Sequence, residues 1–302
     1  MNWRGLVAPV KLRLTRPRVL AHGALLAVVT LWSVNNVAVK VGLLYMKPLD
    51  FIVVRFLIAG STLLLISIAQ HRHLVRPPPL SRLIPAALVG VTANQLCYTY
   101  GLQLTTAVNV SLILGLSPIA AAILLIVVDR RLPSLHQFVA VCLGFVGLVL
   151  VLGGSQGVGS VVGDLIAVGN PITWALYTVI ADRWAHRIPV VTFTAWTMLL
   201  GALGFTPTLL FVGDLLKTDW QNVAVPLAFS AIFATGLGYA AYFWALPRLG
   251  VAPTTIYIYL PPVMGAAAGA LLLHEPFGVL QALGAVIILA AAYAGSWRVA
   301  PP

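Results

Sequence analysis

Long apolar stretches follow one another along the whole chain, and only short polar gaps separate them. An α-helix needs about 20 residues to cross the hydrocarbon core of a bilayer, and each stretch approaches or exceeds that length. Cutting the chain at charges, prolines and glycine clusters predicts ten helices, with no gap long enough for a soluble domain. The predicted helices are residues 22–44, 51–70, 83–103, 107–127, 136–153, 164–181, 190–212, 223–246, 250–273 and 277–296.

The composition excludes a soluble protein. Only 8% of the residues are charged, 60% are hydrophobic, and the mean hydropathy is +0.99. Soluble domains carry about 25% charged residues, so this chain cannot cover a water-facing surface. The net charge of +11 is scattered singly through the short gaps, so we expect no nucleic-acid partner. The predicted fold class is an all-α polytopic membrane protein with ten transmembrane helices.

Cofactor motifs are missing from the sequence. Cys97 and Cys142 both fall inside apolar stretches, where we expect each to be a small buried hydrophobe. No CxxC pattern and no HExxH spacing occurs, so no metal and no other cofactor are expected. There is no phosphate-binding P-loop, so we do not expect ATP to drive the protein.

Positive charges divide unequally between the two sides of the membrane. With the N-terminus inside, fourteen Lys and Arg fall in cytoplasmic segments, and only Lys47 and Lys217 fall outside. Because cytoplasmic loops are enriched in these residues, ten spans with both termini in the cytoplasm are predicted. The apolar run after residues 1–20 is too long for a signal peptide and lacks a small-x-small cleavage site. We therefore expect a basic cytoplasmic tail followed by a retained first helix.

The two halves of the chain match each other at a nearly constant offset. “YTYGLQLTTAVNVS” (98–111) corresponds to “YFWALPRLGVAPTT” (242–255) at an offset of 144, and Trp32 corresponds to Trp174 at an offset of 142. Five helices per half is an odd number, so the second half must be inverted in the membrane, as is typical of secondary transporters. The predicted five-helix repeats are residues 21–153 and 164–297, joined by a glycine-rich outer linker at 154–163.

Several segments resemble a known family. They are “LWSVNNVAVKVG” (31–42), “VRFLIAG” (54–60), “YGLQLTTAVNVSLILGLSPIAAAIL” (100–124) and “YFWALPRLGVAPTTIYIYLPP” (242–262). In combination they resemble EamA-type members of the drug/metabolite transporter superfamily, over nearly the whole chain beyond residue 20. The resemblance implies an inner-membrane exporter or permease of two inverted five-helix repeats. It also implies that helices 1, 3, 4, 6, 8 and 9 surround a central cavity for a small-molecule substrate.

Polar and aromatic side chains form stripes on five of the predicted helices. Asn170, Thr173, Trp174 and Tyr177 follow the i, i+3, i+4, i+7 spacing of one helix face. Amides that join helices and aromatics at the membrane interface would explain single residues. The coincidence of the stripes with the cavity helices of the family favours a substrate pathway. Its candidate residues are Trp32, Asn35, Asn36, Lys40, Asn94, Tyr98, Asn170, Trp174, Tyr177, Tyr239, Tyr242 and Tyr257.

Three charged residues are candidates for a gate or for a structural role. Lys40 and Arg55 fall inside predicted helices, where a positive charge costs about 2.5–3.5 kcal/mol. Either side chain could line the pathway or extend to the interface, and Arg55 could pair with Asp50. Glu275 is the only glutamate of the chain and stands directly before Pro276. It could cap the start of the last helix or act at an outer gate.

The predicted function is secondary transport, as an exporter of a small organic metabolite such as an amino acid, by alternating access through a central cavity. A nucleotide-sugar or lipid-precursor carrier or flippase of the same superfamily is the alternative. A membrane-embedded enzyme would need catalytic residues at one depth, and the sequence offers no such set. The six histidines are expected in the termini, loops and hairpins.

Overall fold

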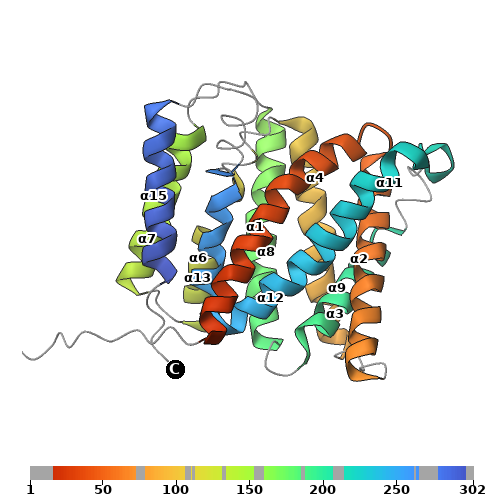
Figure 1. Ribbon diagram of the computed structural model, residues 1–302, viewed down its shortest axis with the longest axis horizontal. Helices are drawn as coiled ribbons and strands as arrows, with labels where there is room; N and C mark the ends of the chain where they lie inside the picture. The colour runs from red at the N-terminus through yellow and green to blue at the C-terminus, as the bar shows by residue number, and fades with distance from the viewer. Residues whose placement is uncertain are drawn as a thin grey trace, which may run out of the picture.

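The computed structural model describes residues 16–72, 79–105, 110, 113–130, 134–152, 160–184, 188–206, 214–261, 263–264 and 278–296. Every regular element within these residues is a helix (Figure 1). In the first half these are α1 (Arg16–Gly42), α2 (Pro48–His71), α3 (Leu80–Ala87), η2 (Leu88–Ala93), α4 (Asn94–Leu104), α6 (Ser117–Asp129) and α7 (Leu135–Leu152).

The described part of the second half follows a similar order with additional short helices. Its elements are α8 (Val161–Trp184), α9 (Val190–Leu203), η3 (Leu215–Lys217), α11 (Trp220–Ala228), η4 (Phe229–Leu237), α12 (Gly238–Leu249), α13 (Val251–Ile256), η5 (Tyr257–Tyr259) and α15 (Val279–Ser296). The helices α7 and α15 stand at the offset of 144 that relates the two halves of the sequence.

Within the described residues, one helix in each half contains a π-helical segment. η2 joins α3 to α4, and η4 joins α11 to α12, so that residues 80–104 and 220–249 each form one continuous helix. The two π segments fall at equivalent places, because the offset of 144 carries residues 88–93 onto 232–237. π-Turns are rare and frequently lie at functional sites. Their recurrence supports the internal repeat and singles out these two helices.

The packing of the helices also repeats. α1 packs against α12, and its counterpart α8 packs against α4, the counterpart of α12. α2 packs against its own counterpart α9, and α7 against its own counterpart α15. Figure 1 shows α7 and α15 side by side at one end of the bundle and α2 at the other, with α1, α8 and α12 between them. The two halves therefore meet in the middle of the molecule.

The outer surface of the bundle is apolar. Leu135 and Phe138 on α7 and Leu280 and Val286 on α15 are all exposed, as expected for side chains that face lipid. Among the described residues, four helical stretches are long and apolar enough to cross a membrane: 17–39, 48–71, 161–183 and 220–249. Four shorter apolar helices lie at 117–127, 135–150, 190–203 and 282–294.

Three expectations from the sequence are corrected. Cys142 is exposed on the outer face of α7 rather than buried, because that face points away from the bundle, and Cys97 is only half-buried. His22 lies within α1 rather than in a terminus or loop. α1 itself begins at Arg16 rather than at residue 22, because arginine is a good helix former and charge does not interrupt backbone hydrogen bonding.

Candidate functional site

An aromatic cluster fills the junction between the two halves. Its members come from α1, α8 and α12 and are Trp32, Trp174, Tyr177, Tyr239, Tyr242 and Phe243. The ring centroids of Trp32 and Trp174 lie 5.5 Å apart, edge to face, and Trp174 lies 5.2 Å from Tyr239 and 5.3 Å from Tyr242. Such contacts stabilise beyond the area they bury, so the cluster is well packed in this conformation.

Within the described residues, two buried polar atoms of the cluster lack a hydrogen bond of ordinary geometry. The Trp32 indole N–H donates to the carbonyl oxygen of Ala234 at 3.0 Å, and the Tyr177 hydroxyl lies 2.6 Å from that of Thr197. Trp174 Nε1 and the Tyr242 hydroxyl are buried and make no hydrogen bond of ordinary geometry in the described part of the chain, although the Tyr242 hydroxyl lies near Trp174 and Thr178. Leaving such groups unpaired costs about 1–3 kcal/mol each, so a ligand that paired with them would recover that energy.

A buried chain of side-chain hydrogen bonds runs beside the aromatic cluster, and we call it the amide chain. Arg55 donates from Nη2 to Gln95 Oε1 at 2.5 Å, and Gln95 donates from Nε2 to Asn94 Oδ1 at 3.1 Å. Asn94 Nδ2 donates to the carbonyl oxygen of Asn170 and to Thr173 Oγ1, both at 3.1 Å. Asn170 Nδ2 returns a bond to the Asn94 carbonyl oxygen at 3.1 Å. The amide chain thus links α2 through α4 to α8.

Arg55 connects the amide chain to the aromatic cluster. Its side chain is only 4% exposed, so it does not extend to the interface. The guanidinium carbon lies 4.9 Å from the ring centroid of Phe56. The Phe56 ring meets the Tyr239 ring edge to face, with their centroids 6.3 Å apart. Asp50 is not the partner of Arg55 in the described structure: Asp50 Oδ2 accepts the backbone N–H of Asp214 at 2.8 Å, and Asp50 Oδ1 is buried with no hydrogen-bond partner among the described residues. The two networks therefore form one continuous buried region.

The remaining candidate residues do not all join this region. The half-buried Tyr98 lies within electrostatic range of Arg55. Asn35 Oδ1 is buried and has no hydrogen-bond partner among the described residues. The Tyr257 hydroxyl pairs with His22 on α1 instead of with the amide chain, at 2.7 Å from His22 Nδ1. The side chains of Asn36 and Lys40, and Glu275 as a whole, lie outside what the structure describes.

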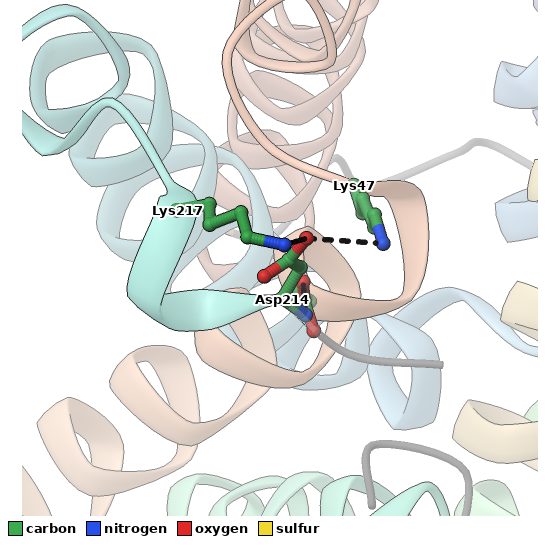
Figure 2. Close-up of polar contacts among 4 residues, drawn as sticks. Lys47, Asp214 and Lys217 are labelled. Carbon is green, nitrogen blue, oxygen red and sulfur yellow. Dashed lines mark hydrogen bonds and ion pairs between the residues drawn. The ribbon is translucent and has the colours of Figure 1, made fainter. Parts of the chain in front are cut away.

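A polar contact joins the start of α2 to the start and end of η3, and we call it the latch (Figure 2). Asp214 Oδ2 lies 3.4 Å from Lys47 Nζ and 3.2 Å from Lys217 Nζ. Desolvation acts to raise the pKa of Asp214, but hydrogen bonds and charge from Lys217 and Lys47 outweigh it and hold this pKa below its usual value. The backbone of Asp219 also donates to the Tyr45 carbonyl oxygen at 3.3 Å.

Sequence reasoning missed several members of the buried region. Phe243 completes the aromatic cluster, with its ring 4.9 Å from that of Tyr177. Thr197 on α9 partners Tyr177, and the α2 residue Phe56 stacks on Arg55. The sequence does not mark these residues, because phenylalanine and threonine are common in apolar helices. Only the tertiary contacts distinguish them.

Comparisons with known proteins agree with this architecture. The profile of the EamA-like transporter family matches the chain twice, over residues 20–153 and 161–296. An uncharacterised transporter of Archaeoglobus fulgidus is 26% identical over 281 residues, covering 90% of this chain and 96% of that protein. A probable amino-acid metabolite efflux pump of Salmonella typhimurium is 26% identical over 292 residues, covering 89% and 92%.

A solved structure shares the fold. A crystal structure with 18% sequence identity superposes with a TM-score of 0.78 and covers 93% of this chain and all of that one. At this identity the likeness concerns the fold alone. The family profile accounts for both halves of the chain, and the apolar helices are those of a multi-pass membrane protein. The names of the relatives indicate a transporter rather than an enzyme. The chain belongs to the EamA-like transporter family.

Proposed function

We propose that this protein exports a small organic metabolite, such as an amino acid, across the cell inner membrane by alternating access. The observation that carries the proposal is the buried polar and aromatic region at the junction of the two halves. Trp174 Nε1 and the Tyr242 hydroxyl lie there close together, and neither makes a hydrogen bond of ordinary geometry in the described chain. A bound solute would supply those partners, and its apolar part would pack against the aromatic rings.

The lining suits an amphipathic organic solute. The aromatic cluster offers ring faces and edges, whereas the amide chain offers donors and acceptors from Asn94, Gln95 and Asn170. An inorganic cation would need oxygen ligands with negative charge, which this region does not offer among its described residues. The name of the Salmonella relative, a probable amino-acid metabolite efflux pump, agrees with this solute class.

Alternating access would arise from the two repeats. We assign them to residues 21–153 and 164–297, inverted with respect to each other and crossing the membrane ten times in total. The first residues of α1 and the last residues of α15 lie at the same end of the bundle, which supports an even number of crossings (Figure 1). The excess of Lys and Arg in the segments predicted to be cytoplasmic supports both termini on that side of the membrane.

The latch would close the outer end of the pathway. Lys47 and Asp214 come from different halves, so their contact holds the two repeats together at that end (Figure 2). A small apolar cluster adjoins it through Met46 and Leu215, the chain neighbours of Lys47 and Asp214, and consists of Val39, Met46, Phe51, Val223 and Leu227, with Leu215 packed against them. On this assignment the structure represents a state closed to the outside, and opening requires the latch to part.

Carriage of a nucleotide sugar or lipid precursor is the second candidate, favoured by one observation. Arg55 is a buried cation, and arginine binds phosphate as well as carboxylate. A nucleotide sugar carries two phosphates, for which the described part of this region provides a single positive side chain. We therefore rank a small metabolite above it.

Efflux from proteoliposomes tests the proposal. Vesicles with the purified protein are loaded with a mixture of amino acids, and the compounds released are compared with those from protein-free vesicles by mass spectrometry. We expect selective release, which Trp174→Ala should abolish because it empties the centre of the aromatic cluster. Phe138→Ala is the matched control, since this ring is exposed on α7. Equal release by wild type and Trp174→Ala would contradict the assigned site.

A topology experiment tests the membrane arrangement. A reporter fused after Arg298 should lie in the cytoplasm, and a cysteine at Gly157 should react with an impermeant reagent from outside. Labelling of that cysteine only after the cells are permeabilised would contradict ten inverted spans.

A further inference from the structure

The guanidinium of Arg55 is a buried positive charge with few partners. The side chain is 4% exposed, lies on α2, and is enclosed by α2, α4 and α12 through Phe56, Gln95 and Tyr239. Its Nη2 donates to Gln95, while its Nε finds no hydrogen-bond partner within the described residues. No carboxylate of the described chain forms an ion pair with it.

Burying the Arg55 guanidinium without a negatively charged partner is energetically unfavourable. Removing an ion from water costs several kcal/mol, and buried charges in proteins are normally paired. Gln95 supplies one neutral acceptor, and the rings of Phe56 and Phe51 supply cation–π contacts at 4.9 and 5.8 Å. These contacts reduce the cost without neutralising the charge. The missing component is an anion that can reach Nε.

We propose that Arg55 binds the carboxylate group of the transported solute, so that the substrate class is restricted to organic monocarboxylates. This inference rests on the proposed function and names the chemistry of its substrate. A carboxylate would accept from Nε and from a neighbouring guanidinium N–H, the bidentate geometry that suits arginine. The carboxylate would replace the negative charge that the described chain does not provide.

The neighbouring rings define the rest of the solute. Phe56 lies beside both the guanidinium and Tyr239, and Tyr239 contacts Trp32 and Trp174. A solute whose carboxylate rests on Arg55 therefore places its other groups against the aromatic cluster. An apolar or aromatic group fits these surroundings. In the described conformation the rings pack together, so binding requires them to separate as the repeats move.

Charge balance distinguishes a carboxylate from a phosphate. A phosphate monoester carries a charge of about −1.5 to −2 at neutral pH, so a single guanidinium would leave part of it unpaired in the interior. A carboxylate carries one charge and is matched by one arginine. The described residues around Arg55 otherwise contribute amides, phenols and apolar rings.

Thermal stability of the detergent-purified protein tests this without any assumption about transport. Three probes share one ring: sodium phenylacetate, 2-phenylethylammonium chloride and sodium phenyl phosphate. We expect phenylacetate to raise the Tm saturably, and the amine and the phosphate to raise it far less. Arg55→Gln should weaken the apparent affinity for phenylacetate about tenfold to a hundredfold, the equivalent of losing a charged hydrogen bond. Arg55→Lys should retain part of the stabilisation by phenylacetate, because lysine keeps the positive charge but cannot donate two parallel N–H bonds to one carboxylate.

Arg248→Gln is the matched control. Arg248 donates to the Trp244 carbonyl oxygen and stacks on that ring near the end of α12, away from the amide chain. It should respond to phenylacetate as wild type does. Equal stabilisation of wild type by the amine, or equal stabilisation of wild type and Arg55→Gln by phenylacetate, would overturn the inference. The comparison of the three probes on the wild-type protein needs no variant, so the inference can still be tested if Arg55→Gln folds poorly.

Efflux of paired solutes separates this inference from the proposed function. Wild-type proteoliposomes are loaded with amino acids together with the amines formed by their decarboxylation. Release of amino acids only supports both proposals. Equal release of the amines leaves transport in place and overturns the role of Arg55. Carboxylate binding without release of any solute supports the site and contradicts export.

Discussion

The indole rings of Trp32 and Trp174 meet edge to face with their centroids 5.5 Å apart. These two residues occupy equivalent positions in the two halves of the sequence, at an offset of 142. Their contact therefore lies where the repeats meet, and any relative motion of the repeats must change it. Trp32 has its N–H bonded to Ala234, whereas Trp174 has no such partner in the described chain. The two tryptophans thus occupy corresponding sequence positions but differ in the hydrogen bonding of their indole N–H groups.

Two buried tyrosines should respond differently to loss of the hydroxyl. Tyr242→Phe removes a buried hydroxyl that makes no hydrogen bond of ordinary geometry among the described residues, so stability should stay the same or rise by up to about 1–3 kcal/mol. Tyr259→Phe removes a hydrogen bond to the Val141 carbonyl oxygen at 3.0 Å and should cost about 0.5–1.5 kcal/mol. Transport should fall only in Tyr242→Phe. Thermal melting and proteoliposome efflux together check this, and the opposite order would contradict it.

Asn94 and Asn170 should be energetically coupled, because each donates to the backbone carbonyl oxygen of the other at 3.1 Å. We expect Asn94→Ala and Asn170→Ala each to destabilise the protein, and the double variant to cost less than their sum. A coupling energy of about 0.5–3 kcal/mol is expected from a double-mutant cycle on thermal or denaturant unfolding. Additive effects would mean that the two bonds act independently.

Most helix positions could be predicted from the sequence, because the lipid core demands apolar runs of a certain length. The prediction of 136–153 corresponds to α7 at Leu135–Leu152, and that of 51–70 to α2 at Pro48–His71. The π segments could not be predicted, because an i to i+5 bond leaves no mark in the apolar pattern. Of the predicted helix 250–273, only the part up to residue 264 is described, with a 3-10 turn at Tyr257–Tyr259.

The candidate site was predictable only as stripes on single helices. The spacing of Asn170, Trp174 and Tyr177 places them on one face, and all three are buried against other helices. Which helix each stripe meets depends on tertiary packing. Tyr257 and Tyr259 lie two residues apart, yet one bonds with His22 on α1 and the other with α7. The link from Arg55 to Gln95 likewise joins residues that no local pattern relates.

Gly90 should not tolerate a side chain. A Cβ at this position in η2 would collide with the ring of Tyr177, which is fully buried and bonded to Thr197. Gly90→Ala should therefore displace the ring, lower the Tm and reduce transport. Gly23→Ala is the control, since no described atom lies within 4 Å of its added Cβ. It should be neutral or stabilise by about 0.4–1 kcal/mol. Equal losses in both variants would contradict the packing argument.

The latch should control access to the outer end. Met46, next to Lys47 in the chain, is 4% exposed, so a cysteine at that position should react slowly with an impermeant maleimide at neutral pH. The test uses a background without Cys97 and Cys142. Asp214→Ala removes the acceptor of both lysines and should accelerate the labelling. Asp219→Asn, which keeps a side-chain oxygen to accept the Asn222 N–H at the start of α11, is a control outside the ion pairs, and acceleration equal to that of Asp214→Ala would contradict a specific role for Asp214.

The latch should also persist through mild acid. Lys217 and Lys47 depress the folded-state pKa of Asp214. The ionised carboxylate therefore stabilises the fold at pH values above its unfolded pKa of about 3.9. This stabilisation is lost as the pH falls through the lower folded pKa. The difference in Tm between wild type and Asp214→Asn should therefore be constant from pH 8 to about pH 5, begin to shrink near the unfolded pKa of about 3.9, and vanish only below the lower folded pKa. The pKa of Asp219 is also lowered, by hydrogen bonds from Asn222, but that carboxylate is present in both proteins and cancels. A difference that already disappears near pH 6 would show that Asp214 is not held by the lysines, and the latch would then be too weak to close the outer end.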